Sequence, residues 1–395
     1  MAWNSLSQAD LNGKKVLARF DFNVPLDGTT ITDSTRIDSC LETIQHLLKS
    51  GAKKVVLMSH LGRPKGKVNQ AYSLEPVATY LAEKLNEEVT LTESCTDSGI
   101  KTLLGLPNTK IILLQNLRFH ADEEANSEEF AKALSSYGDI YVNDAFGTCH
   151  RKHASTHAVV KFFEAKDCFV GPLIEAEVSA LNNVLESPKK PFVAILGGAK
   201  VSDKIKIIKR LLPQVDQMLI GGAMAYPFLA AKGLEIGNSM CNQEDVTLAK
   251  MILNGSGKEK IRLPLDHVTS PSLDGDATAC QNQEILEGQI ALDIGEKTVR
   301  EYSQLISSAK TILWNGPMGL FENEKFAKGT FSLAQAIAEN NKCFSLVGGG
   351  DSVSAINKSG LASKISHIST GGGASLEFIE EGSLPGINAL KFGVN

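Results

Sequence analysis

Residues 193–200 read Val-Ala-Ile-Leu-Gly-Gly-Ala-Lys, an apolar run of strand length that ends in two glycines. Four later stretches repeat this pattern of strand, glycine turn and helical segment: residues 218–224, 312–319, 344–351 and 368–374. The copies are irregularly spaced, which excludes a solenoid of equal repeats. Glycine turns at the carboxyl ends of parallel strands let the backbone approach a ligand. The second half of the chain is therefore predicted to be a doubly wound parallel sheet.

The first half of the chain alternates strand-like and helix-like segments. The short apolar runs typical of buried strands are residues 16–20, 54–58, 111–114 and 140–142. Between the first two, Ile37, Leu41, Ile44 and Leu48 recur at helical spacing, and Gly51 is placed to end that helix. Strands that alternate with helices indicate a second parallel sheet with helices on both faces.

Two domains and a connector are predicted from the length and the break points. A chain of 395 residues exceeds one typical core. Residues 171–186 are predicted to form one helix after a Gly-Pro pair, and the Ser-Pro-Lys-Lys-Pro run that follows ends it. We expect an α/β protein of two Rossmann-like domains, over 1–170 and 187–382, joined by a hinge helix over 171–186.

The composition indicates which classes of partner to expect and where in the cell the protein is located. The net charge of −5 and the pI near 6.0 disfavour a broad nucleic-acid surface. No apolar run approaches the roughly 20 residues of a membrane span, and the N-terminus lacks the layout of a secretory signal. Seven scattered cysteines without Cys-x-x-Cys indicate reduced thiols. We expect a cytoplasmic protein with neither membrane nor nucleic-acid partners.

Several common enzyme signatures are missing from the sequence. It contains no Gly-x-x-x-x-Gly-Lys-Ser/Thr, which excludes the ordinary P-loop, and no Gly-x-Gly-x-x-Gly, which disfavours a dinucleotide dehydrogenase. The Gly-x-Ser-x-Gly, His-Glu-x-x-His and protein-kinase patterns are absent too.

Basic and imidazole side chains gather at or after the strand ends of the first half. They are Arg36, His60, Arg63, Arg118, His120, His150 and Arg151. Arginines that converge from separate loops suit phosphate or carboxylate, because the planar fork donates two hydrogen bonds and stays charged. The segment around His150, His153 and His157 could suggest zinc, but Arg151 and Lys152 lie between them and would repel a cation. An anion site is the favoured interpretation.

The second half carries cationic groups of another kind. Lys200 and Lys204 follow the first glycine turn, and we expect them one helical turn apart at a helix start, where they could hold nucleotide phosphates. A solvated helix face is the alternative, and we favour it for the nearby Lys206, Lys209 and Arg210. Asp351 follows three glycines and could be a helix N-cap or a ligand of Mg²⁺.

Eight motifs in order resemble those of the phosphoglycerate kinase family over essentially the whole chain. In the first half they are Arg-Phe-Asp-Phe-Asn-Val-Pro (19–25), Ser-His-Leu-Gly-Arg-Pro (59–64), Asn-Leu-Arg (116–118) and Asn-Asp-Ala-Phe-Gly-Thr-Cys-His-Arg (143–151). In the second half they are Leu-Gly-Gly-Ala-Lys-Val-Ser-Asp-Lys (196–204), Trp-Asn-Gly-Pro-Met-Gly (314–319) with Glu322, Val-Gly-Gly-Gly-Asp-Ser (347–352) and Ser-Thr-Gly-Gly-Gly-Ala (369–374).

This resemblance implies a site for each substrate. 3-Phosphoglycerate or 1,3-bisphosphoglycerate would be held by Asp21, Phe22, Asn23, Arg36, His60, Leu61, Gly62, Arg63, Arg118 and Arg151. ADP or ATP with Mg²⁺ would be held by Lys200, Lys204, Glu322, Gly349, Gly350, Asp351 and Ser352, with Asp351 towards the metal. Arg36 and Lys200 would be catalytic, and the tail over 383–395 would pack on the first domain. A monomer that closes about its hinge is expected.

The sequence departs from the family pattern at a few positions. Cys149 and Lys152 stand where alanine is common, and the connector reads Glu-Ala-Glu over 175–177 where Glu-Lys-Glu is common. The second departure leaves details of the hinge open. Two other classes also stay open: a doubly wound dehydrogenase, and a scaffold that keeps the fold without activity.

Overall fold

The computed structural model describes residues 3–394, and the chain divides into two compact units. The first comprises Met1–Ser179 with Ser383–Asn395, and the second comprises Ala180–Gly382. Their boundary falls within α6 (Pro172–Leu185), which is the helix predicted over 171–186. Helix α6 begins where it does partly because Asp144 Oδ1 accepts hydrogen bonds from the N–H groups of Leu173 and Ile174. A hinge role for this helix stays a prediction.

The first unit is built on a six-stranded parallel sheet in the order β5-β6-β4-β1-β7-β8. Its strands are β1 (Lys15–Arg19), β4 (Lys54–Met58), β5 (Val89–Leu91), β6 (Ile111–Leu113), β7 (Ile140–Asn143) and β8 (Cys168–Val170). Central β1 pairs with both β4 and β7, so that Ala18 lies beside Leu57 and Val142. A small hairpin, β2 (Leu26–Asp27) and β3 (Thr30–Ile31), follows β1.

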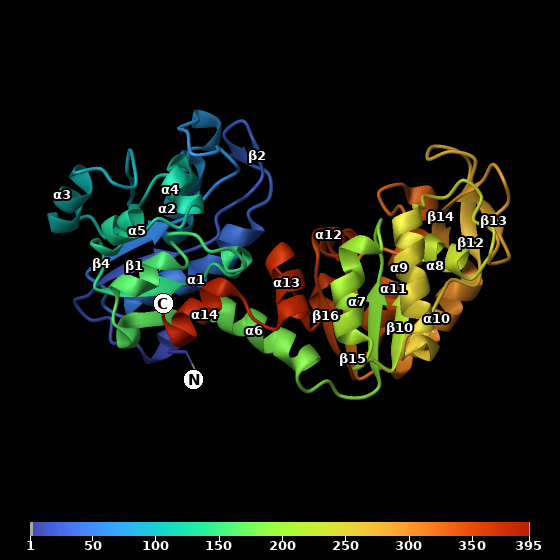
Figure 1. Cartoon of the computed structure of the whole chain (residues 1–395). Helices are drawn as coiled ribbons and strands as arrows, with labels where there is room; N and C mark the ends of the chain where they lie inside the picture. The colour runs from blue at the N-terminus through green and yellow to red at the C-terminus, as the bar shows by residue number, and fades with distance from the viewer. Residues whose placement is uncertain (1–2, 395) are drawn as a thin grey trace. The chain divides into compact units, whose positions relative to one another are not determined.

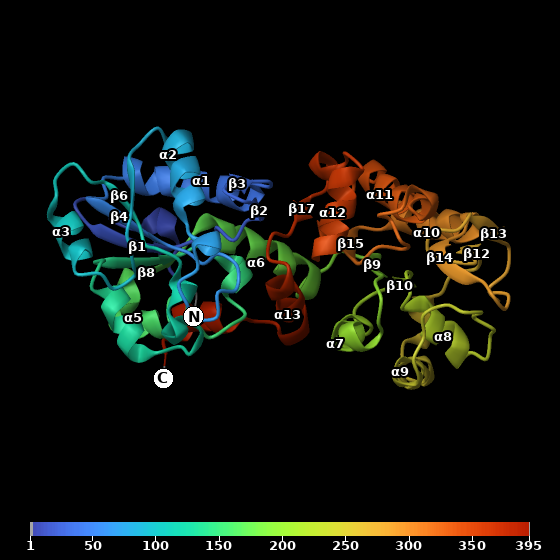
Figure 2. The same cartoon turned by 90° about the horizontal axis from the view of Figure 1, so that it is seen from above.

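Helices cover both faces of this sheet. Residues of α1 (Thr35–Lys49) and α2 (Glu75–Leu85) share one core with Val16 and Ala18, whereas α3 (Gly99–Gly105) and α5 (Glu128–Ser135) share the opposite core with Leu17. Figure 2 shows α1 and α2 on one side of β1 and β4, with α5 on the other. Successive residues of a strand point to opposite faces, so a sheet covered twice needs continuous apolar runs.

The last helix, α14 (Pro385–Phe392), belongs to the first unit. Ala389 lies in the same core as α5, and the N–H of Gly386 donates to the carbonyl of Cys149 at 2.9 Å. A Cβ atom on Gly386 would lie 3.1 Å from the Cα atom of Cys149, so the two segments are in close contact here. The segment thus packs against the loop that carries Arg151.

The predicted apolar stripe of α1 is present, but the face that the helix buries is rotated slightly from the predicted one. Ile37 and Ile44 are fully buried, while Leu41 and Leu48 are only half-buried at the edge of the core. Gly51 follows the helix with a φ of +84°, the left-handed conformation that ends many helices. The predicted helical spacing and the predicted end of the helix at Gly51 are both confirmed.

The second unit contains a six-stranded parallel sheet in the order β11-β10-β9-β15-β16-β17. Its strands are β9 (Phe192–Leu196), β10 (Gln217–Ile220), β11 (Ile261–Arg262), β15 (Thr311–Asn315), β16 (Phe344–Val347) and β17 (His367–Ile368). The five glycine stretches all follow strands of this one sheet, at its carboxyl edge. The predicted fold class is confirmed, since both six-stranded sheets are parallel throughout.

Helices flank this sheet in two sets (Figures 1 and 2). One set is α7 (Ile205–Leu211), α8 (Ala225–Ala231) and α9 (Gln243–Asn254), and the other is α10 (Glu296–Ser308), α11 (Lys328–Glu339) and α12 (Gly350–Lys358). Helix α13 (Gly373–Glu381) packs on α7. A separate antiparallel sheet, β13-β12-β14, comprises β12 (His267–Ser270), β13 (Thr278–Cys280) and β14 (Ile290–Ile294). None of the helices between residues 3 and 394 combines the length and apolar composition of a membrane span.

The glycine turns of the second unit pack directly on one another. A Cβ atom on Gly316 would lie 2.2 Å from the carbonyl oxygen of Gly197, and one on Gly222 would lie 2.7 Å from the nitrogen of Gly198. Both Gly316 and Gly222 also have positive φ angles. Only glycine satisfies both demands, so this edge of the sheet is made largely of peptide groups.

Candidate active site

A cluster of polar groups joins the end of β1 to the start of α1. Asp21 Oδ1 accepts from the N–H of Asn23 at 3.2 Å, and Arg36 Nη1 donates to the Asn23 carbonyl at 3.0 Å. The same Nη1 lies 3.4 Å from Asp21 Oδ2. The Arg36 side chain is 37% exposed and lines a cavity of about 420 Å³ together with Asn23 and Asp33. One edge of the guanidinium is therefore held by hydrogen bonds, and another edge faces the cavity, where it could contact a ligand.

The loops after β1, β4 and β6 are linked by further hydrogen bonds. Asn23 Oδ1 accepts from the N–H of Gly62 at 2.8 Å, and Arg118 Nη1 donates to the Gly62 carbonyl at 2.9 Å. Gly62 has a φ of +61°, and a Cβ atom there would lie 2.3 Å from the Tyr72 ring. The structure thus brings together three loops that the sequence singled out separately.

His60 is almost fully buried and neutral. Burial, followed by the positive charges of Arg19 and Arg118, holds its pKa well below the usual range. Arg19 Nη2 lies 3.2 Å from His60 Nδ1, closer than Asp21 Oδ1 at 3.8 Å. Because a guanidinium can only donate, Nδ1 accepts and the ring proton is on Nε2. The contact with Asp21 is consequently not an ion pair.

The remaining predicted arginines differ in exposure. Arg118 is 7% exposed, and its Nε lies 3.4 Å from Glu124 Oε1. Burial lowers the pKa of Arg118, which Glu124 partly offsets. Arg63 and Arg151 are exposed, and Arg151 Nε donates to His150 Nε2 at 3.0 Å. One anchored guanidinium and two exposed ones therefore come from three different loops.

Phe22 and Leu61 serve the loops rather than offering polar side chains. The Phe22 ring is fully buried and stacks on Phe20 with centroids 5.6 Å apart, while its N–H donates to Ser59 Oγ. Leu61 is buried too, and Asn116 bonds both its N–H and its carbonyl. Asn116 belongs to the Asn-Leu-Arg motif but was not among the predicted site residues. Its hydrogen bonds to Leu61 nevertheless fix the loop that carries His60.

Two further histidines of the first unit, His120 and His153, lie beside polar side chains of the fold. His120 Nε2 lies 3.2 Å from Ser94 Oγ. His153 lies 3.9 Å from Glu123, and burial lowers its pKa to about 3, with a further contribution from Arg118. Among the described residues, no three His, Cys, Asp or Glu side chains gather so as to hold a metal ion.

The predicted helical spacing of Lys200 and Lys204 is wrong. Lys200 is exposed in the glycine turn, and Lys204 ends a short 3₁₀ turn (Ser202–Lys204) directly before α7. The N–H of Ser202 donates to Asp245 Oδ1 at 2.7 Å, so a contact with α9 holds this segment outside the helix. The two ammonium groups therefore come from a loop and a helix start.

Lys204 is half-buried and belongs to a chain of polar contacts at the ends of β15 and β16. Its Nζ donates to Asn315 Oδ1, and Asn315 Nδ2 donates to the Gly348 carbonyl at 2.7 Å. Burial lowers the pKa of Lys204, while the carboxylates of Asp203 and Asp351 act in the opposite direction. Asn315 lies within a quoted motif but was not among the predicted site residues. Its amide sets the position of the lysine.

A cavity of about 270 Å³ opens beside these residues. Its walls are largely backbone and aliphatic groups, including Gly198, Gly222 and Leu292, and Glu322 and Asp351 line it too. Such walls suit a flat ring system with a charged tail. Two carboxylates on one cavity also fit Mg²⁺, which takes one or two carboxylates together with phosphate oxygens.

The prediction of Asp351 as a possible N-cap needs correction. The N-cap of α12 is Gly349, with a φ of +91°, so Asp351 lies in the first helical turn. Gly349 must be glycine also because a Cβ atom would lie 2.7 Å from Asn315 Nδ2. Gly350 begins the helix, and the buried hydroxyl of Ser352 accepts from the N–H of Gly316. Asp351 itself is exposed.

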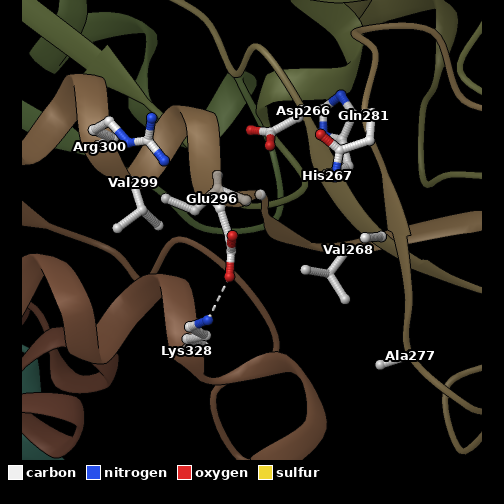
Figure 3. A pocket seen from close by; sticks show the side chains of 12 residues that line it. Asp266, His267, Val268, Ala277, Gln281, Glu296, Val299, Arg300 and Lys328 are labelled. Atoms are coloured by element: carbon white, nitrogen blue, oxygen red, sulfur yellow. Dashed lines mark hydrogen bonds and ion pairs between the residues drawn. The ribbon is translucent and has the colours of Figure 1, made fainter.

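A larger cavity elsewhere in the second unit does not have these properties. It has a volume of about 500 Å³ and lies where β12 and β14 meet the start of α10 (Figure 3). Lys328 Nζ there is already paired with Glu296 at 2.8 Å, as the dashed line in Figure 3 marks. Asp266 accepts from the first turn of α10. None of the predicted site residues lines this cavity.

Comparisons with known proteins agree on one family. The family model described as phosphoglycerate kinase matches residues 6–382. A phosphoglycerate kinase of Acidobacterium capsulatum is 48% identical over 98% of each chain, and one of Chlorobium phaeovibrioides is 48% identical over 99% of this chain and 100% of its own. The chain belongs to the phosphoglycerate kinase family.

Solved structures of the family share this fold. The phosphoglycerate kinase of Coxiella burnetii matches with a TM-score of 0.91 and 39% identity over 100% of both chains. That of Pyrococcus horikoshii matches with a TM-score of 0.84 and 33% identity over 99% of both. The predicted family, enzyme class and reaction are confirmed: the chain is a glycolytic phosphotransferase with a carboxyl group as acceptor.

Proposed function

We propose that the reversible transfer between 1,3-bisphosphoglycerate and ADP, giving 3-phosphoglycerate and ATP, uses one substrate site on each unit. The main support for this proposal is that the two units offer different kinds of binding groups. Cations gather at the strand ends of the first unit, whereas the second unit has a glycine-walled cavity beside Lys204 and Asp351. The first set suits a small, strongly anionic acid, and the second suits a nucleotide.

The triose acid would bind at the linked loops after β1, β4, β6 and β7. Arg63, Arg118, Arg151 and the Nε2–H of His60 would hold its distal phosphate and carboxylate, since guanidinium forks donate in pairs to such groups. Asp21, Asn23 and Gly62 would shape the loops around it. Phe22 and Leu61 would support those loops from the core.

The nucleotide would bind in the second unit. Its ring would occupy the cavity near Leu292, with Glu322 at the same wall. Lys200, Lys204 and the N-terminal turn of α12, including Gly349, Gly350 and Ser352, would hold its phosphates. Asp351 would hold Mg²⁺, which when bound neutralises phosphate charge.

No general base is required for this reaction. The attacking group in the direction of ATP use is a carboxylate, which is ionised at neutral pH. Catalysis then depends on position and on neutralising the charge of the transferring group. We assign Arg36 and Lys200 to that group, because both are cations that are at least partly exposed at their sites.

Transfer between sites on different units requires the units to come together. Closure would also exclude water that hydrolyses an acyl phosphate. We propose that residues 171–186 act as the hinge between domains over 1–170 and 187–382. We further propose a cytoplasmic monomer without nucleic-acid partners, which the net charge of −5 supports.

A coupled assay with 3-phosphoglycerate, ATP and Mg²⁺ tests the proposal. Turnover should require all three, and omission of the coupling dehydrogenase should abolish the change in NADH absorbance. A change without the coupling enzyme would favour the dehydrogenase alternative. Binding of both substrates without turnover would favour a scaffold.

A further inference from the structure

A buried hydrogen-bond chain lies behind the triose-acid site, and it begins at Glu123. This residue lies on α4 (Ala121–Glu124) and is 0% exposed. Its Oε1 accepts from the hydroxyl of Ser155 at 2.6 Å, and its Oε2 accepts from the N–H of Ser155 at 3.0 Å. A separation of 2.6 Å is typical of a hydroxyl that donates to a carboxylate.

The chain continues from Ser155 to His60. Ser155 Oγ accepts from Arg19 Nε at 2.9 Å, and Arg19 Nη2 donates to His60 Nδ1 at 3.2 Å. Arg19 is 1% exposed and also donates to the Phe20 carbonyl. Each contact has a defined donor and acceptor, because a guanidinium only donates and an ionised carboxylate only accepts.

The charges in this chain compensate one another. Burial raises the pKa of Glu123, while Arg19 and the two hydrogen bonds from Ser155 act to lower it. His153, which also faces Glu123, has its pKa lowered to about 3 and is neutral at pH 7. Both oxygens of Glu123 accept hydrogen bonds from Ser155, which is the pattern of an ionised carboxylate, and this charge balances the buried guanidinium of Arg19. Removal of either group would leave the other uncompensated.

Glu123 also connects two substrate loops. It lies five residues after Arg118, and its own carbonyl accepts from the N–H of Ala154 at 2.9 Å. Ser155 lies four residues after Arg151. One carboxylate thus ties together the segments of both arginines and, through Arg19, the end of β1.

We propose that Glu123 is a positioning residue for the triose-acid site, which through Ser155 and Arg19 holds His60 in the tautomer that carries its proton on Nε2. That nitrogen can then donate to an anionic oxygen of the substrate. The inference rests on the proposed role of His60 in binding the acid. It assigns a role to Glu123 alone within the Asp-Glu-Glu run at 122–124, since Asp122 and Glu124 are exposed.

Two variants test this assignment. Glu123→Gln removes the charge and presents an amide in place of one accepting oxygen, and Ser155→Ala removes the hydroxyl that joins Glu123 to Arg19. Each should raise the KM for 3-phosphoglycerate by roughly 10- to 100-fold, by analogy with the loss of hydrogen-bond partners behind metal-ligating side chains. The KM for Mg-ATP should stay within about twofold, because that site is on the other unit.

A second readout separates positioning from general stability. In ¹⁵N-histidine-labelled enzyme at pH 7, assigned with His60→Gln, the His60 signals should be those of the Nε2–H tautomer. Both test variants should alter these signals. Asp122→Asn, an exposed carboxylate of the same helical turn, is the matched control and should change neither the KM values nor the spectrum.

Each outcome decides the proposal. Folded variants whose KM for 3-phosphoglycerate stays within twofold, or whose KM rises while the His60 signals are unchanged, would overturn it. Failure of both variants to fold would assign the chain to stability alone and overturn it too. If the wild type shows no turnover with 3-phosphoglycerate, the proposed function fails, and the His60 spectrum still reports whether Glu123 sets the tautomer.

Discussion

Replacement of Arg36 by alanine is the sharpest test of the proposed chemistry. The guanidinium lies at the start of α1, is 37% exposed and lines the cavity beside Asn23. If it contacts the transferring phosphoryl group mainly in the transition state, kcat should fall by roughly 10²–10⁵-fold. That loss corresponds to about 3–7 kcal/mol of activation free energy.

The structural contacts of Arg36 are too few to explain such a loss. Its hydrogen bond to the Asn23 carbonyl is worth about 0.5–1.5 kcal/mol. The 3.4 Å pair with Asp21 is partly exposed and screened by solvent, so it adds less than about 1 kcal/mol. The free energy of unfolding should therefore drop by no more than about 2.5 kcal/mol.

Steady-state kinetics and urea unfolding on Arg36→Ala, Arg36→Lys and Lys49→Ala give the answer. Lysine should restore activity only in part, because it returns the charge without the planar fork. Lys49→Ala, which removes an exposed cation from the other end of the same helix, should leave kcat unchanged. A kcat for Arg36→Ala within a few-fold of wild type would remove Arg36 from the mechanism.

Four further predictions concern the metal, the hinge, a glycine and a buried acid. Asp351→Asn should weaken calorimetric binding of Mg-ADP while leaving 3-phosphoglycerate binding intact, and equal loss of both would indicate a structural role. Small-angle scattering should give a smaller radius of gyration with both substrates than with either alone; an unchanged radius would reject closure. Gly62→Ala should lower the melting temperature, because its Cβ atom would lie 2.3 Å from the Tyr72 ring at a positive φ; an unchanged value would reject this constraint. Burial raises the pKa of Asp293 to about 7 from its ordinary 3.8. Between pH 3.8 and pH 7 the Asp293 carboxyl is therefore protonated in the native chain and ionised in the unfolded chain. The free energy of unfolding of the wild type, relative to Asp293→Asn, should thus fall as pH rises from about 4 to about 7, and a flat difference would contradict the assignment.

The sheets were predictable because their signals are local. Five apolar runs that end in glycine all turned out to lie on one parallel sheet, and the stripe of Ile37 and Ile44 identified α1. The antiparallel sheet of β12, β13 and β14 was not predicted, since its β13 is partly exposed and carries no apolar alternation. The start of α7 was misjudged because it depends on Asp245, which is remote in the sequence.

The site was predictable only where residue type itself signals chemistry. Arginines and lysines near strand ends indicated an anion site, and the motifs assigned them to a family. Asn315 and Glu123 were missed because buried polar residues resemble surface ones until their partners are known. Asn315 lies in a conspicuous Trp-Asn-Gly-Pro run, which could have identified it, whereas Glu123 lies in an acidic run that suggests only solvent.

The place of α14 in the first unit has a consequence for how the chain is made. The ribosome delivers residues 1–179 first, and the whole second unit follows before Ser383–Asn395 emerges. Until then the core that receives Ala389 is incomplete, and the Cys149 carbonyl lacks the N–H of Gly386. Because this contact supports the loop that carries Arg151, we expect a nascent chain to reach the competent acid-binding conformation only once residues 383–394 have been made and have packed on the first unit.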